Sequence, residues 1–142
     1  MTTRRESILT AIASSLASVA GVSGRVYRSR VEPIARNESP AVIVEPVSDQ
    51  ADVPDVVGRI NWRMTVRVTV YVRANVPDQA SDSIVQSLYA LILADPSIGG
   101  RALDTKPVSV NFESLEADVP AGIVTSDFEV LYQTAYSDMS TL

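Results

Sequence analysis

Three aspartates recur at three-residue intervals in one segment of the chain, and this is the first pattern that could support chemistry. Asp49, Asp52 and Asp55 lie within residues 46–58, a stretch with two prolines and no regular period. A calcium loop has denser oxygen ligands, a glycine at its turn and a terminal glutamate. The aspartates match that arrangement poorly. We therefore expect a solvated acidic loop, no metal site and no cofactor, and a loop of this length is often functional.

Two residue types that dominate enzyme chemistry are missing. The sequence contains no cysteine and no histidine. Thiolate catalysis, cysteine-bound zinc and the usual base of a serine triad are therefore excluded. The Gly99-Gly100 pair predicts the end of a helix rather than a phosphate loop or a nucleophile turn. We expect a protein that is not an enzyme.

Arginine gathers in one part of the chain, at Arg25, Arg28, Arg30 and Arg36. Such charge can protect an exposed edge strand from aggregation, or it can form a contact surface for an acidic partner. The acidic segments 46–58 and 114–122 of a second copy would offer that partner, and head-to-tail contacts close into rings. The residues predicted for this contact are Arg28, Arg30 and Arg36 on one side and Asp49, Asp52, Asp55, Glu116 and Asp118 on the other.

Overall charge and hydropathy narrow the class of protein. The 142 residues include 12 basic and 17 acidic side chains, a net charge of −5. Nucleic-acid-binding proteins usually show the opposite balance, because phosphate contacts need Lys and Arg. The hydrophobic fraction of 46% suits a globular chain, and no apolar run approaches the roughly 20 residues of a membrane span. We expect no membrane contact, no direct nucleic-acid binding, and a chain that is cytosolic when made.

The longest regular pattern in the sequence runs from Arg59 to Arg73. Every even residue from Ile60 to Val72 is apolar, and every odd residue is polar or amphipathic. A period of two predicts a strand with one buried face. Its expected length of about 45–50 Å exceeds the roughly 35–40 Å diameter of a compact domain of this size. The strand should therefore curl around the core or project toward another subunit.

The remaining elements follow from their own periodicities. We expect helices over about 3–20 and from residue 78, with Asp78 as the N-cap of the second. We expect further strands over 25–30, 41–45, 108–112 and 123–136, and a frayed tail over 137–142. The predicted fold is a single α+β domain of 142 residues in the order α-β-β-β-α-β-β. It has two layers: one mixed, mostly antiparallel sheet of about five strands, with both helices on one face.

The two long strands are expected to lie side by side. A crossover through the second helix makes the fourth strand parallel to the third, and the fifth then returns antiparallel, which lets the two long strands lie side by side. Arg63 and Arg67 on one strand would face Asp127 and Glu129 on the other. Each such cross-strand pair contributes about 0.2–1 kcal/mol.

Several segments, taken in order, resemble the bacteriophage tail terminator family of the minor tail protein U type. The segments are Arg4-Arg5-Glu6-Ser7-Ile8, 24–30, Ser39-Pro40-Ala41-Val42-Ile43-Val44, the strand from Trp62 to Val72, 94–100 and 128–134. The resemblance rests on their order and spacing over most of the chain. Some of these features are shared with tail completion and neck proteins of other phages.

The resemblance implies a structural virion protein without catalysis. Such proteins form a ring of six copies at the head-proximal end of the tail tube, stop tube polymerisation and present a surface to the head connector. The implied partners are copies of itself, the tail tube protein, a neck or head connector protein and, in a contractile tail, a sheath protein. The implied location is the virion, with the host cytoplasm during assembly.

Other functions remain open from the residues alone. One is a neck or head–tail connector subunit. A second, of another class, is a small ligand-binding α+β regulatory domain, and a third is a carboxylate-dependent metal enzyme. The over-long strands and the absence of a convergent polar pocket pattern favour the ring protein over the ligand-binding domain.

Overall fold

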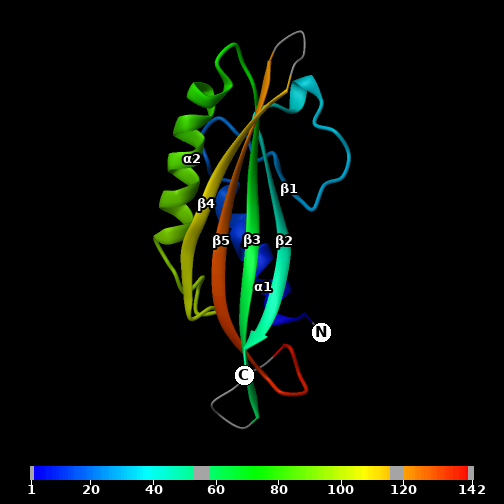
Figure 1. Cartoon of the computed structure of the whole chain (residues 1–142), viewed down its shortest axis with the longest axis vertical. Helices are drawn as coiled ribbons and strands as arrows, with labels where there is room; N and C mark the ends of the chain where they lie inside the picture. The colour runs from blue at the N-terminus through cyan, green and yellow to red at the C-terminus, as the bar shows by residue number, and fades with distance from the viewer. Residues whose placement is uncertain (1, 53–57, 116–119, 141–142) are drawn as a thin grey trace.

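The computed structural model describes residues 2–52, 58–115 and 120–140, and it leaves out the side chain of Arg36. Two α-helices and five strands account for most of this chain (Figure 1). In chain order they are α1 (Arg4–Leu16), β1 (Val26–Arg28), the 3-10 turn η1 (Arg36–Glu38), β2 (Ala41–Asp52), β3 (Arg59–Arg73), α2 (Pro77–Leu93), β4 (Asp104–Leu115) and β5 (Ala121–Ala135).

All five strands form one sheet in the order β1-β2-β3-β5-β4. β1 pairs parallel with β2, and the other three pairings are antiparallel. Since β3 and β4 both run antiparallel to β5, they are parallel to each other, as the sequence predicted. The sheet runs along the long axis of the molecule, with α2 along its β4 side and α1 behind β2 and β3 (Figure 1). The α+β fold class and the element order are confirmed.

The predicted alternation of β3 is confirmed in position and in sidedness. The strand begins at Arg59 and ends at Arg73, and Met64, Val66, Val68, Val70 and Val72 are buried. The same face of β5 buries Phe128, Val130 and Tyr132. Both helices cover this face with their apolar stripes, which include Ile8, Ile12, Leu16, Ile84, Leu88 and Ile92. The core is therefore the layer between the even residues of the long strands and the two helices.

The first helix begins as its sequence predicted. The hydroxyl of Thr3 accepts a hydrogen bond from the backbone N–H of Glu6 at 3.2 Å, which satisfies one free donor of the first turn. The backbone N–H of Arg4 donates to the carbonyl of Met139 at 2.8 Å, so the chain near its C-terminus is fixed beside the start of α1. The fraying expected over residues 137–142 stays a prediction. Residues 141–142 lie outside the described chain.

The second helix begins differently from the prediction. Its N-cap is Val76, which has no capping side chain, and Pro77 occupies the first turn. Proline suits that position because it has no N–H to leave unsatisfied. Asp78 therefore lies inside the helix, and its predicted role as the N-cap is wrong.

The expected loop over residues 46–58 is wrong for its first half. β2 continues to Asp52 and pairs with β3 down to Asn61. The register shifts between Pro46 and Ser48, so Val47 is an extra residue that breaks the alternation. The sequence period is lost there, although the strand continues. Likewise, β4 is longer than predicted because Pro107 is accommodated on an edge strand.

Candidate assembly surface

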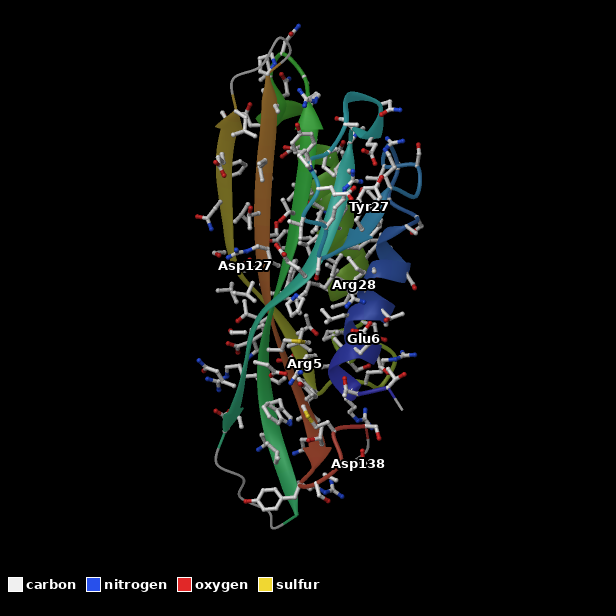
Figure 2. The ribbon with its side chains drawn as sticks, turned by 90° about the vertical axis from the view of Figure 1, so that its right-hand side faces the viewer. Arg5, Glu6, Tyr27, Arg28, Asp127 and Asp138 are labelled. Atoms are coloured by element: carbon white, nitrogen blue, oxygen red, sulfur yellow. The ribbon has the colours of Figure 1, made fainter. Side chains whose placement is uncertain are left out.

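Two arginines of the predicted contact surface, Arg28 and Arg30, are already engaged within the subunit. Arg28 donates from both terminal nitrogens to the carboxylate of Glu6, at 3.0 Å each. Because Arg28 is in register with buried Val44, it lies on the helix side of the sheet and joins β1 to α1. Figure 2 shows Arg28 and Glu6 on this side, with Asp127 on the other.

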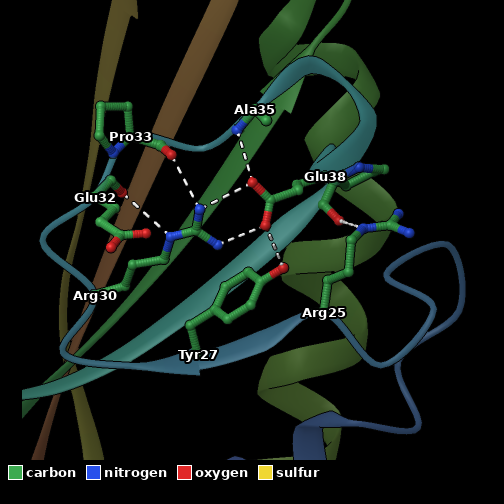
Figure 3. Close-up of polar contacts among 8 residues, drawn as sticks. Arg25, Tyr27, Arg30, Glu32, Pro33, Ala35 and Glu38 are labelled. Atoms are coloured by element: carbon green, nitrogen blue, oxygen red, sulfur yellow. Dashed lines mark hydrogen bonds and ion pairs between the residues drawn. The ribbon is translucent and has the colours of Figure 1, made fainter.

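Arg30 organises the loop that follows β1. It contacts the carboxylate of Glu38 at 2.6 and 2.9 Å and donates to the carbonyls of Glu32 and Pro33 (Figure 3). Its guanidinium lies 4.5 Å from the ring centroid of Tyr27. The Arg30 guanidinium, with the backbone N–H of Ala35 and the Tyr27 hydroxyl, lowers the pKa of Glu38 to about 2.

The two described aspartates of the predicted surface lie on β2 rather than in a loop. Asp49 is nearly buried. It accepts hydrogen bonds from Arg5 of α1, at 2.7 Å, and from the hydroxyl of Tyr132 of β5. Asp52 forms an exposed ion pair with Arg63 at 3.4 Å. Burial and the Asp49 carboxylate raise the pKa of Tyr132, so its hydroxyl stays protonated and donates. Asp49 therefore holds three elements together.

The four described residues of the predicted contact lie on or next to neighbouring strands of the sheet. β1 and β2 are neighbours, so Arg28, Arg30, Asp49 and Asp52 all lie toward one edge of the sheet. Arg36 is in η1, but its side chain is not described, and Asp55, Glu116 and Asp118 lie outside the described residues. A role for all eight in a contact between copies remains a prediction.

The sheet instead has two open edges that the sequence reasoning missed. β1 covers only Val42 to Val44 of β2, so the stretch Glu45–Asp52, here called the β2 edge, has no outer neighbour strand. At the opposite end of the strand order, β4 is likewise unpaired on its outer side. Both statements concern the described residues only. Unpaired strand edges are the natural place for another chain to bind.

The two edges carry the same tripeptide. Pro46-Val47-Ser48 follows Glu45 on β2, and Pro107-Val108-Ser109 follows Lys106 on β4. In both strands the register shifts between the proline and the serine, which makes each valine the extra residue of a bulge. This repeat is a signal in the sequence that could have identified both edges.

The paired registers place the two prolines on one row across the sheet. Pro46 is in register with Val66, Val66 with Phe128, and Phe128 with Pro107. The row therefore begins and ends with a proline at opposite edges. Glu45 and Lys106 lie next to this row, both on the face away from the helices, since their partners Arg67 and Glu129 lie there.

Apolar side chains are exposed along the β4 edge. Val108 is 59% exposed, Val110 38% and Phe112 69%. Val110 and Phe112 are in register with the buried residues Ser126 and Val124, so they lie on the helix side of the sheet but beyond the cover of α2. On the other edge Val47 is 48% exposed. Exposed apolar side chains at both edges are typical of a surface that a partner covers.

The described residues offer no large enclosed pocket. A hollow of about 160 Å³ lies between α1 and α2, lined by Ile12, Leu91, Ile92, Ile98 and Arg101 among others. Small-molecule sites usually have about 300–1,000 Å³. The larger hollows on the described surface are wide open to solvent. No group of acidic residues in the described chain could hold a metal ion.

Comparisons with known proteins give a likeness of fold. No protein-family profile and no curated protein sequence matches the chain. A solved structure described as "Virion of native gene transfer agent (GTA) particle" contains a chain of similar fold, with a TM-score of 0.60 and 14% identity. The match covers 87% of this chain and 93% of that chain. No helix within the described residues is both long and apolar enough to span a membrane.

Proposed function

We propose that this chain is a structural protein of a phage-like virion, and that it caps the head-proximal end of the tail tube as a ring of copies. The observation that carries the proposal is the likeness of fold with a chain of a gene transfer agent virion over 87% of this chain. The resemblance to tail terminators, noted in the sequence, points in the same direction. We infer that the ring ends tube polymerisation and offers a surface for head attachment.

The geometry of the chain supports assembly rather than catalysis. The polar side chains with the most partners, Arg30 and Asp49, are used to hold elements of the fold together. Half of the exposed large apolar residues of the described chain lie on the two edge strands, where a neighbouring subunit would cover them: Val47 on β2 and Val108, Val110, Phe112 and Leu115 on β4. The partners we propose are further copies of the chain, six to a ring, the tail tube protein and a head connector.

The experiment that tests this function mixes the purified chain with preassembled tail tubes and images them by electron microscopy. We expect one end of each tube to carry a six-membered ring, and tube growth from that end to stop. Tubes that keep growing at both ends in saturating protein would contradict the proposal. A neck or connector subunit would leave bare tubes uncapped and bind only tails that already carry a terminator, so the same images separate the two functions.

A further inference from the structure

We propose that copies of this chain associate head to tail through the opposite edges of the sheet. With Pro107 of one copy opposite Pro46 of the next, the first part of the β4 edge, Asp104–Ser109, would lie against the β2 edge, Glu45–Asp52. Val110 and Phe112 would then face β1 of that neighbour, because β1 covers the rows of Val44 and Val42. This inference rests on the proposed assembly into a ring and adds which surfaces meet. Its partner is a second copy of the same chain.

Strand direction permits this contact to repeat. β2 runs antiparallel to β3, and β4 runs parallel to β3, so β2 and β4 run in opposite directions within one sheet. A rotation about an axis along the strands leaves these directions unchanged. β4 of one copy therefore meets β2 of the next in antiparallel orientation, and the same step, repeated, closes a ring.

The prolines determine what kind of contact this is. With Pro107 opposite Pro46 of the neighbour, neither residue has an N–H to donate, so a continuous ladder of backbone hydrogen bonds is interrupted there. This protects both edges against indiscriminate strand pairing. The contact is instead made by side chains, and the exposed valines of the two bulges, Val47 and Val108, are the apolar groups nearest to that row.

Charge selects opposite edges over like edges. Lys106, the only lysine of the chain, has 64% of its side chain exposed, and its ion partner within the subunit is Asp104 at 3.6 Å. Two β4 edges would bring Lys106 toward Lys106, and two β2 edges would bring Glu45 toward Glu45. The mixed contact brings Lys106 toward Glu45 instead, and repulsion between like charges is an effective source of specificity.

The register brings the two charges within reach of each other. With Pro107 of one copy opposite Pro46 of the neighbour, Lys106 lies opposite Ser48 of the neighbour. Glu45 of the neighbour lies two rows away on the same face, so it is the diagonal neighbour of Lys106. Diagonal neighbours across an antiparallel pair are about 7–8 Å apart, which a lysine side chain can span.

Cysteine cross-linking tests the contact directly, because the chain has no cysteine of its own. Variants Val47→Cys and Val108→Cys are prepared separately, and the full-length chains are oxidised alone and as a mixture. Within one subunit the two positions are separated by three strand spacings, about 14 Å, so no bond can form inside a subunit. We expect covalent dimers from the mixture and little product from either variant alone. The chain carrying both substitutions should give a ladder of oligomers.

Two results would overturn the inference. One is a dimer of Val108→Cys alone that forms as readily as the mixed dimer, which would indicate a two-fold contact between β4 edges. The other concerns a matched control, Val47→Cys mixed with Val76→Cys, which places the second cysteine at another exposed valine. The inference fails if the mixture of Val47→Cys and Val108→Cys yields no more cross-linked dimer than this control. The mixed reaction is repeated on tube ends, so that a contact formed only there is also detected.

A charge exchange supplies an independent readout in the same assay. Lys106→Glu and Glu45→Lys should each lower the yield of mixed cross-links severalfold, and the two substitutions combined in one chain should restore it. Failure of the combined chain to recover would count against the contact. Cross-linking in solution does not depend on tube capping, so this inference and the proposed function can fail separately.

Discussion

Arg67 on β3 and Asp127 on β5 lie directly opposite each other, with Nε to Oδ1 at 3.0 Å and Nη2 to Oδ2 at 3.3 Å. The pair lies on the face away from the helices, where Arg63 also approaches Glu129 at 3.7 Å. These are the charge pairs expected from the sequence. They join the two longest strands, so Arg63 and Arg67 act within the subunit.

Removing this pair should weaken the sheet modestly. We expect Asp127→Ala to lower the free energy of unfolding by about 1 kcal/mol, because Arg67 is partly exposed and solvent screens the pair. The exchanged variant Arg67→Asp with Asp127→Arg should recover part of that loss. Urea unfolding of the single and exchanged variants measures both values. An exchanged variant no more stable than the sum of the single changes would show that the two residues are not coupled.

Asp49 should be more sensitive than the exposed aspartate on the same strand. Asp49→Ala leaves the Tyr132 hydroxyl and Arg5 without their shared acceptor, so we expect a loss of about 1–3 kcal/mol. Asp52→Ala is the matched control, since its pair with Arg63 is exposed and should contribute under about 1 kcal/mol. Thermal unfolding compares the two. Equal losses would show that the Asp49 contacts do not stabilise the fold.

Gly122 marks a close approach between β5 and the start of α2. A methyl group at this position would overlap the Cβ atom of Pro77. We expect Gly122→Ala to destabilise the chain by about 1–3 kcal/mol, because overpacking forces the helix away from the sheet. Gly122→Ala combined with Pro77→Gly, which removes the overlapping Cβ atom, probes the cause. The stability of the combined variant should differ from the sum of the single changes, and strict additivity would place the strain elsewhere.

Stability should depend on pH through Glu38. Its pKa in the folded chain is about 2, against an ordinary value of 4.5. The contacts with Arg30, Ala35 and Tyr27 therefore stabilise the fold fully above pH 4.5, and this contribution is lost as the pH falls toward 2. The stability gap between the wild type and Glu38→Gln should shrink over that window. Urea midpoints taken across it measure the gap, and a constant gap would exclude Glu38 as its source.

Local periodicity determined most of the secondary structure. In β3 the buried residues alternate without interruption, so its ends and its sidedness follow from the sequence. The same alternation did not predict the full length of β2. The bulge at Val47 shifts the alternation there, and the second half of the strand, from Pro46 onward, is mostly exposed. A strand that buries little apolar surface leaves little trace in the hydrophobic pattern.

For the candidate assembly surface too, some features follow from the sequence and others only from the tertiary structure. The sequence by itself determined which residues carry charge, that no histidine or cysteine is present, and that Pro-Val-Ser occurs twice. Only the tertiary structure decided that Arg28 and Arg30 pair with Glu6 and Glu38, and that Pro46 and Pro107 lie on one row. The reason is physical: charge is a property of a residue, whereas a partner or a row depends on strand order and register, which long-range pairing sets.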